Sequence, residues 1–185
     1  SSTQNPESKR VLQLQEKSRT RRKEGLFVIE GQRELLLAQK GGYEIRQIFF
    51  CLELIPQQQL ENLLEAFPSD LALTQLSEEV YRKLAYRGGS EGILALAVAK
   101  ETSLDLLELS SKNPLILVAE APEKPGNIGA LLRTADAAKV DAVLIANPKT
   151  DLYNPNIIRS SVGGVFTNTV ATGSTSEIIT FLQNR

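Results

Sequence analysis

The first hundred residues alternate between short apolar runs and longer stretches with helical spacing. Four apolar runs predict strands, and they are "GLFVIEG", "IRQIFFC", "LALTQ" and "EGILALAVA". Four stretches with apolar positions at helical spacing predict helices, and they cover residues 5–18, 32–42, 56–67 and 77–85. This order predicts a small α/β sandwich of about a hundred residues.

A polar segment interrupts this alternation after Ala99. "KETSLDLLELSSKNP" ends in a Ser-Ser-Lys-Asn-Pro cluster, which is typical of a linker between domains. We therefore predict a first domain over residues 1–105, a linker over residues 106–113 and a second domain over residues 114–185.

The second domain is expected to be an α/β unit with a parallel sheet. Its predicted strands are "LILVAE", "AVLIAN" and "VFTNTVAT", while helices or turns are predicted for the stretches between them and for "STSEIITFLQNR". Three strands in about seventy residues bury little core alone. We expect this domain to pack against the first domain or a partner, or to continue beyond Arg185.

The composition narrows the possible chemistry. The chain has no histidine and one cysteine, Cys51, which excludes the usual zinc sites and every histidine-based triad or acid–base pair within the chain. We expect no metal. No apolar run approaches the length needed to cross a bilayer, and the N-terminus lacks the pattern of a secretory signal. We therefore expect a cytoplasmic protein that makes no membrane contact.

Charge is balanced over the whole chain but not along it. The 21 basic and 22 acidic side chains give a net charge of −1. Seven basic residues crowd the first 23 positions, and they are Lys9, Arg10, Lys17, Arg19, Arg21, Arg22 and Lys23. This cluster fits phosphate contact at a defined place, and it equally fits a solvated, partly disordered arm.

The stretch "EKPGNIGALLRTADAAKVDAVLIAN" contains the strongest candidate site. Its apolar spacing predicts an amphipathic helix, with a core face formed by Ile128, Leu131, Leu132 and Ala135. Asn127 is a natural N-cap, and Gly129 permits close approach of another backbone or a ligand. A helix N-terminus at the carboxyl end of a strand is where open α/β sheets bind ligands.

Arg133 lies on a second face of this helix, together with Gly129 and Asp136. Its planar guanidinium is suited to phosphate. The alternative is an ordinary exposed ion pair between Arg133 and Asp136.

The segment "IIRSSVGGVF" is the second candidate. Paired serines followed by paired glycines predict a tight turn whose free hydroxyls and N–H groups suit an anion or a ribose, or else a polar helix end with a glycine stop. The chain has no G-x-G-x-x-G and no G-x-x-x-x-G-K, which disfavours dehydrogenases and NTPases.

These motifs resemble those of the SpoU (TrmH-like) RNA ribose 2′-O-methyltransferases of the SPOUT superfamily. The family pattern N-x-G-x-x-x-R-T-A is similar to Asn127, Gly129, Arg133, Thr134 and Ala135. The segment "IIRSSVGGVF" resembles the family's R-x-S-x-G segment, which places Arg159, Ser161, Gly163 and Gly164. The stretches "GLFVIEGQRELLLA" and "LAYRGGSEGILALA" resemble the family's L30e-like, substrate-binding N-terminal domain. The family's second and third motifs, which hold most of the cofactor contacts, are absent from this chain.

The resemblance implies a ribose 2′-O-methyltransferase that uses S-adenosylmethionine. It implies a trefoil knot in the complete protein, of which the C-terminal half is absent here, and a homodimer. Arg133 is then expected to act on the 2′-hydroxyl with Asn127 supporting the site, and the residues expected to contact RNA are Arg19, Arg21, Arg22, Lys23, Arg159 and Ser161. Cofactor-binding residues are not predicted, because the motifs that hold them lie beyond Arg185.

The RNA substrate is left open. By analogy, the substrate-binding domain favours 23S ribosomal RNA over transfer RNA. The rival hypothesis is a non-catalytic RNA-binding protein that uses the L30e-like domain and its basic N-terminal cluster.

Overall fold

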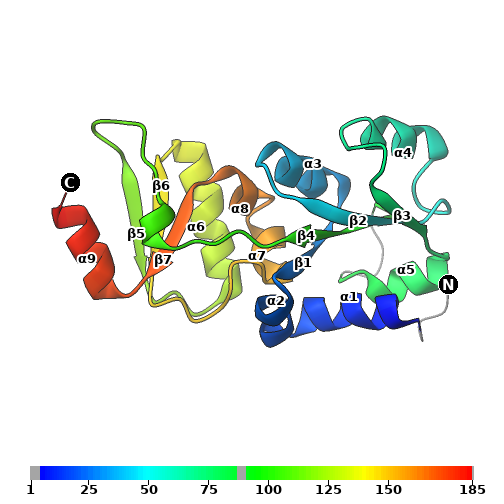
Figure 1. Ribbon diagram of the computed structural model, residues 1–185, viewed down its shortest axis with the longest axis horizontal. Coiled ribbons are helices and arrows are strands. Elements are labelled where there is room, and N and C mark those ends of the chain that lie inside the picture. The colour runs from blue at the N-terminus through cyan, green and yellow to red at the C-terminus, as the bar shows by residue number, and fades with distance from the viewer. Residues whose placement is uncertain (1–4, 87–90, 185) are drawn as a thin grey trace. The chain divides into compact units, whose positions relative to one another are not determined.

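The computed structural model describes residues 5–86 and 91–184 (Figure 1). Residues 1–4, residues 87–90 and Arg185 lie outside the described residues. Residues 87–90 belong to the segment "LAYRGGSEGILALA", and the others are the two ends of the predicted domains. The chain divides into two compact units, Ser1–Ala99 and Lys100–Arg185, and each is an α/β structure. The predicted fold class is confirmed.

The first unit is built on a four-stranded mixed sheet with the strand order β1-β4-β2-β3. Its strands are β1 (Leu26–Glu30), β2 (Ile45–Phe50), β3 (Ala72–Gln75) and β4 (Ile93–Val98). β4 is antiparallel to both β1 and β2, and β3 is parallel to β2. Because β4 lies inside the sheet with helices over both faces, its first five residues are all buried, which confirms the sequence prediction.

Helices cover both faces of this sheet. They are α1 (Pro6–Glu16), α2 (Ser18–Glu24), α3 (Gln32–Lys40), α4 (Gln57–Leu64) and α5 (Glu78–Leu84). α1 and α5 lie over one face, where Leu14, Tyr81 and Leu94 belong to one core cluster, and α3 and α4 lie over the other (Figure 1).

The basic segment after α1 is helical, so the hypothesis of a disordered arm is wrong. α2 follows α1 after Lys17 and ends at Gly25, which adopts the left-handed conformation (φ 62°). The sequence of α2 has no periodic apolar face that would predict a helix. Its only buried residue is Arg21, which an apolar pattern cannot detect.

The second unit contains three parallel strands in the order β5-β6-β7. The strands are β5 (Ile116–Glu120), β6 (Ala142–Ala146) and β7 (Val170–Gly173). The helices are the short 3₁₀ helix η1 (Leu104–Leu106), α6 (Pro125–Ala138), α7 (Pro155–Ser160), α8 (Gly164–Thr167) and α9 (Thr175–Gln183). α9 and η1 contribute to the core on one face of the sheet, and α6 lies on the other (Figure 1).

The predicted strand "VFTNTVAT" is only half right. Val165 and Phe166 belong to α8, and the strand begins at Val170. Gly163 turns the chain (φ 81°), and the side-chain amide of Asn168 donates to the carbonyl oxygen of Gly164 (2.6 Å), which closes a single helical turn. Tertiary packing therefore overrides the strand preference of valine and phenylalanine.

Residues 100–105 belong to the second unit, whereas the predicted first domain extended to residue 105. The backbone N–H of Thr172 in β7 donates to the carbonyl oxygen of Thr102 (2.6 Å), and Ser103 forms an isolated parallel bridge with Thr172. The entering chain thus pairs with the open edge of β7. The polar composition of this segment predicts a linker, because composition alone does not show that the backbone pairs with a strand.

Glu34 on α3 gives the first unit a pH-dependent stability. Burial raises the pKa of this half-buried carboxyl, and the charges of Glu91 and Glu30 act in the same direction. Ionised Glu34 therefore opposes folding at neutral pH, and this cost disappears as the pH falls through the raised pKa of the folded state. Glu34→Gln is expected to raise the melting temperature at pH 7, with the gain vanishing below the ordinary pKa of 4.5.

The measurement is the melting temperature between pH 4 and pH 8, with circular dichroism used to monitor thermal unfolding. Glu65→Gln, at the exposed end of α4, is the matched control and is expected to change little. A lower melting temperature for Glu34→Gln at pH 7 would contradict the expectation.

Candidate functional site

The candidate helix α6 follows the carboxyl end of β5, as expected for an α/β ligand site. Its N-cap is Lys124 and its first residue is Pro125, so the prediction that Asn127 is the N-cap is wrong. Proline is favoured in the first helical turn because its fixed φ suits a helix and it lacks an N–H group that would need a partner. Asn127 lies two residues further on, in the first turn, and is exposed.

Arg133 is exposed in the middle of α6. Within the described part of the chain, its guanidinium has no hydrogen-bond or ion-pair partner. Asp136 instead accepts a hydrogen bond from the hydroxyl of Thr167 (2.7 Å). The alternative of an Arg133–Asp136 ion pair is therefore wrong, and Arg133 remains available to an anion from outside.

α6 does not place Asn127 and Arg133 side by side. Six residues separate them, so at 3.6 residues per turn their side chains diverge by about 120° and lie about 9 Å apart along the axis. A small substrate group cannot touch both residues of one chain without spanning that gap. Their joint role stays a prediction.

Gly129 serves the packing of α6 against α7. A Cβ atom at this position would collide with the hydroxyl of Ser160 and would lie 2.8 Å from the backbone nitrogen of Ser161. Glycine is therefore required because two backbones meet here. Of the two predicted reasons for this glycine, the structure supports the backbone contact.

The turn from α7 to α8 does not form the predicted anion site. Ser160 donates to the carbonyl oxygen of Asn156 (2.5 Å), and Ser161, only 2% exposed, donates to that of Ile158 (3.0 Å). The N–H groups of Val162, Gly163 and Gly164 all bond to backbone carbonyl groups within the turn. These hydroxyls and N–H groups stabilise the turn, so burial argues against RNA contact by Ser161.

Arg159 fits its predicted role better. It is exposed at the end of α7, where its Nη2 donates to the side-chain oxygen of Asn156 (2.6 Å). This single bond leaves donors available for phosphate.

A polar cluster that the sequence did not predict lies at the carboxyl edge of the parallel sheet. Asn147 donates to Glu120 Oε1 (3.0 Å) and to the hydroxyl of Thr175 (2.7 Å), and Thr175 donates to Glu120 Oε2 (2.7 Å). These bonds, with the charge of Lys149, lower the pKa of Glu120, so its carboxylate is ionised at neutral pH. Glu120 is the last residue of the apolar strand β5, and Asn147 directly follows the apolar strand β6. This position at the end of a strand was the signal available in the sequence.

The predicted RNA contacts on α2 divide into two groups. Arg19, Arg22 and Lys23 are exposed. Arg21 is 3% exposed, and its Nη1 donates to the carbonyl oxygens of Leu14 (2.6 Å) and Gln15 (2.9 Å). The prediction that Arg21 contacts RNA is therefore corrected, because this guanidinium caps the last turn of α1.

Known proteins match both units. Residues 5–95 match the MRM3-like substrate binding domain, and residues 114–185 match the SpoU rRNA methylase family. The crystal structure of an RNA 2′-O ribose methyltransferase is 38% identical and gives a TM-score of 0.82, with 99% of this chain and 68% of that chain covered. The chain belongs to the SpoU family. The resemblance inferred from the two motifs is thus confirmed.

Two further relatives of this SpoU chain act on ribosomal RNA. A 23S rRNA (uridine(2479)-2′-O)-methyltransferase of Streptomyces viridochromogenes is 26% identical over 89% of this chain and 57% of its own length. A 23S rRNA (guanosine(2553)-2′-O)-methyltransferase of Bacillus subtilis is 27% identical over 79% and 54%. The chain therefore spans little more than half the length of these relatives.

An AdoMet-bound rRNA methyltransferase from Sinorhizobium meliloti shares the fold. Its TM-score is 0.84 at 20% identity, with 99% of this chain and 67% of that chain covered.

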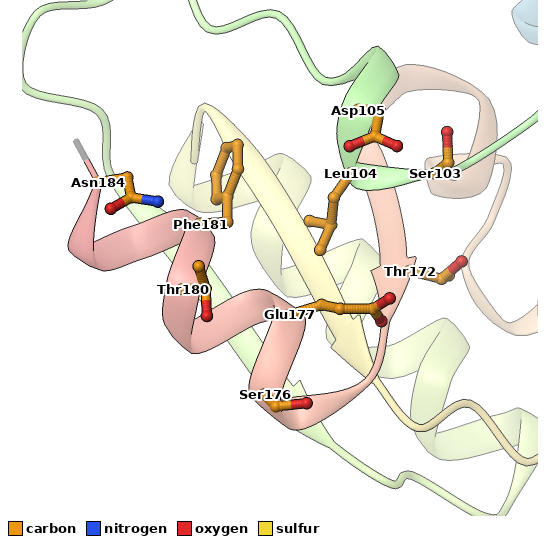
Figure 2. A pocket seen from close by; sticks show the side chains of 9 residues that line it. All are labelled: Ser103, Leu104, Asp105, Thr172, Ser176, Glu177, Thr180, Phe181 and Asn184. Carbon is orange, nitrogen blue, oxygen red and sulfur yellow. The ribbon is translucent and has the colours of Figure 1, made fainter.

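A cleft of about 680 Å³ in the second unit of the SpoU chain includes no residue of the two family motifs (Figure 2). It runs between η1 and α9, and its charged lining residues are the carboxylates Asp105 and Glu177. None of the sequence-predicted site residues lines it. A cleft lined by carboxylates repels phosphate, so we assign it no part in RNA binding.

Among residues 5–86 and 91–184, no group of three or more His, Cys, Asp or Glu side chains could hold a metal ion. No helix in those same ranges is long and apolar enough to span a membrane.

Gly129→Ala tests the packing role of this glycine. Alanine is favoured over glycine inside a helix by about 1 kcal/mol. The collision with α7 is expected to outweigh that gain and to lower the free energy of unfolding by about 1–3 kcal/mol. Denaturant unfolding measures it. Gly126→Ala, whose added Cβ would meet no atom within 4 Å, is the matched control and should be neutral or stabilising.

Arg21→Ala tests the capping of α1. The loss of two charge-assisted hydrogen bonds from a buried site is expected to cost about 2–3 kcal/mol of unfolding free energy. Arg22→Ala, one residue further along α2 but exposed, should change it by no more than about 0.5 kcal/mol. Equal effects of the two substitutions in denaturant unfolding would show that Arg21 has no structural role.

Proposed function

We propose that the protein containing this chain transfers a methyl group from S-adenosylmethionine to the 2′-hydroxyl of a ribose in RNA, with 23S ribosomal RNA as the substrate. The main support is the exposed Arg133 at the family's motif position, which has no ion-pair partner among the described residues and lies on a helix that follows the carboxyl end of a parallel strand. The ribosomal RNA methyltransferases among its relatives support the substrate class.

Arg133 acts on the substrate as a hydrogen-bond donor and as a fixed positive charge. A hydroxyl is a poor nucleophile until its developing negative charge is stabilised. A guanidinium stays protonated in proteins, so Arg133 is not the proton acceptor. It holds the phosphate beside the ribose and stabilises the charge that develops on the 2′-oxygen, while the phosphate or water takes the proton. Asn127 orients the RNA on the other side of α6.

S-adenosylmethionine supplies an electrophilic methyl group when bound. The described residues do not form a site for it by themselves. The polar cluster at the carboxyl edge, Glu120, Asn147 and Thr175, hydrogen-bonds internally rather than presenting free donors. We therefore assign no cofactor contact to this cluster.

The same family membership supports a proposal for the assembly. We propose a cytoplasmic homodimer whose second unit is completed as a knotted parallel sheet. In the first unit RNA contacts the exposed basic side chains of α2, namely Arg19, Arg22 and Lys23, and in the second unit it contacts Arg159.

A non-catalytic RNA-binding protein is the second candidate, because residues 5–95 match a substrate-binding domain and α2 exposes three cations. The two functions differ in one requirement, since only the enzyme must bind S-adenosylmethionine. Calorimetric titration of the natural protein with this cofactor separates them.

Arg133→Lys keeps the positive charge but loses the planar fork. We expect it to reduce methyl transfer by about a hundredfold or more in the natural protein, because one preorganised donor to developing charge contributes this much in other enzymes. RNA affinity should stay close to that of the unchanged protein. The assay is transfer of a radiolabelled methyl group to RNA, with filter binding measured in parallel.

Lys112→Ala, at an exposed position in the same unit, is the control for a lost surface charge. Full methyl transfer by Arg133→Lys would remove Arg133 from the mechanism.

A further inference from the structure

A groove of about 450 Å³ lies on the first unit, and none of the predicted site residues is among those that line it. It lies where β1 and β2 begin and β4 ends. The residues that define it chemically are Arg10, Glu24, Leu26, Arg46, Gln47 and Val98. We call it the strand-end groove.

The floor of the strand-end groove is apolar and only partly covered. Leu26 and Val98 are register partners across β1 and β4, and both are partly exposed. Further along the same face of the sheet, Val28 and Leu94 are buried beneath α1 and α5. The layer of helices therefore ends before the sheet does, and it leaves an apolar surface beside solvent.

A β-bulge places an arginine on one rim. Ile45 pairs with Ala97 and Gln47 pairs with Leu96, so Arg46 is the extra residue between two consecutive pairs. A bulge interrupts the hydrogen-bond ladder, and proteins use bulges to redirect a side chain. The side chain of Arg46 is 59% exposed, and among the described residues its only ion pair is an exposed one with Glu44 (3.1 Å). Such a pair contributes about 0–1 kcal/mol, so a phosphate can displace it.

Arg10 also lines the groove. Its Nε bonds to Glu24 Oε2 (2.6 Å), and this contact ties α1 to the end of α2. Among the residues that the structure describes, the two terminal Nη atoms of Arg10 have no hydrogen-bond partner. The pair fixes the guanidinium and leaves its terminal donors for an anion.

Gln47 adds a group that can recognise a base. Its amide nitrogen donates to the hydroxyl of Thr74 (2.9 Å) and to Glu7 (3.3 Å). These bonds fix the orientation of the amide, and no described residue donates to its oxygen. An oriented acceptor beside an apolar floor suits the amino or imino edge of a nucleobase.

From this arrangement we infer that the strand-end groove binds one unpaired nucleotide of the RNA substrate, with the base on Leu26 and Val98 and the flanking phosphates on Arg10 and Arg46. The inference rests on the proposed RNA substrate. The volume lies within the range of small-ligand sites, and an apolar floor between arginines fits a splayed-out base better than a duplex. Glu24 is the last residue of α2, so the basic face of that helix continues the phosphate path.

Binding of two fluorescent RNAs to the natural protein tests this inference. The probes are a short single-stranded oligouridylate and a blunt RNA duplex of the same length. Arg10→Ala and Arg46→Ala are each expected to weaken single-strand binding by about tenfold, and duplex binding less. Arg82→Ala is the matched control, because Arg82 is an ion-paired arginine of the same unit with 48% side-chain exposure, and it should stay within about twofold.

A neutral change in the floor separates base binding from simple charge attraction. Val98→Ser leaves all charges in place and is expected to weaken single-strand binding while leaving duplex binding unchanged. Circular dichroism melting checks that each variant is folded.

Two results would overturn the inference. In the first, Arg10→Ala and Arg46→Ala bind the single-stranded RNA as tightly as Arg82→Ala does. The other is equal losses for both RNAs together with no effect of Val98→Ser, which would make the groove a site of charge alone. The proposed function fails separately, if the natural protein binds no RNA or does not transfer a methyl group. A protein that methylates RNA while the groove variants match the control refutes only the groove.

Discussion

The close contact between α6 and α7 is the constraint on which the second unit depends. The hydroxyl of Ser160 in α7 lies where a Cβ of Gly129 would be, and the backbone nitrogen of Ser161 lies 2.8 Å from that position, so the helix axis can shift very little without a collision. One turn later, the side chain of Asn168 donates to the carbonyl oxygen of Leu132 (2.9 Å) and ties α6 to the end of α8. Arg133 follows Leu132 directly, so the exposed guanidinium extends from one of the most firmly held turns of the helix. An exposed side chain on a fixed backbone is suited to positioning a substrate.

The same contact explains why a motif of small and polar residues is not a list of ligands. Gly129 and Ser161 belong to the family's motifs, and Ser160 lies between two motif residues, yet within this chain their atoms contact one another or nearby carbonyl groups. Arg133 and Arg159 occupy the same segments and face solvent. Sequence motifs here combine residues that build the scaffold with residues that the scaffold presents.

Much of the fold follows from hydrophobic periodicity, because buried strands and amphipathic helices leave a strong pattern. β4 and β6 are apolar throughout, and both proved to be central strands. Features set by polar atoms were harder to predict. Pro125 moved the start of α6 ahead of Asn127, and the buried Arg21 appears in the sequence as one more surface cation. The hydroxyls of the serine–glycine turn were predicted to be free, since nothing in the sequence indicates which carbonyl group a hydroxyl will reach.

The pairing of Ser103 with Thr172 determines whether the second unit, taken without the first, has an exposed strand edge. A strand edge with unpaired N–H and carbonyl groups invites association with other strands, and proteins protect such edges. Here the protecting strand is the chain that leads into the domain. A fragment starting at residue 114, where the family match begins, would leave that edge of β7 bare and prone to aggregate. One starting at Lys100 would keep its own cover.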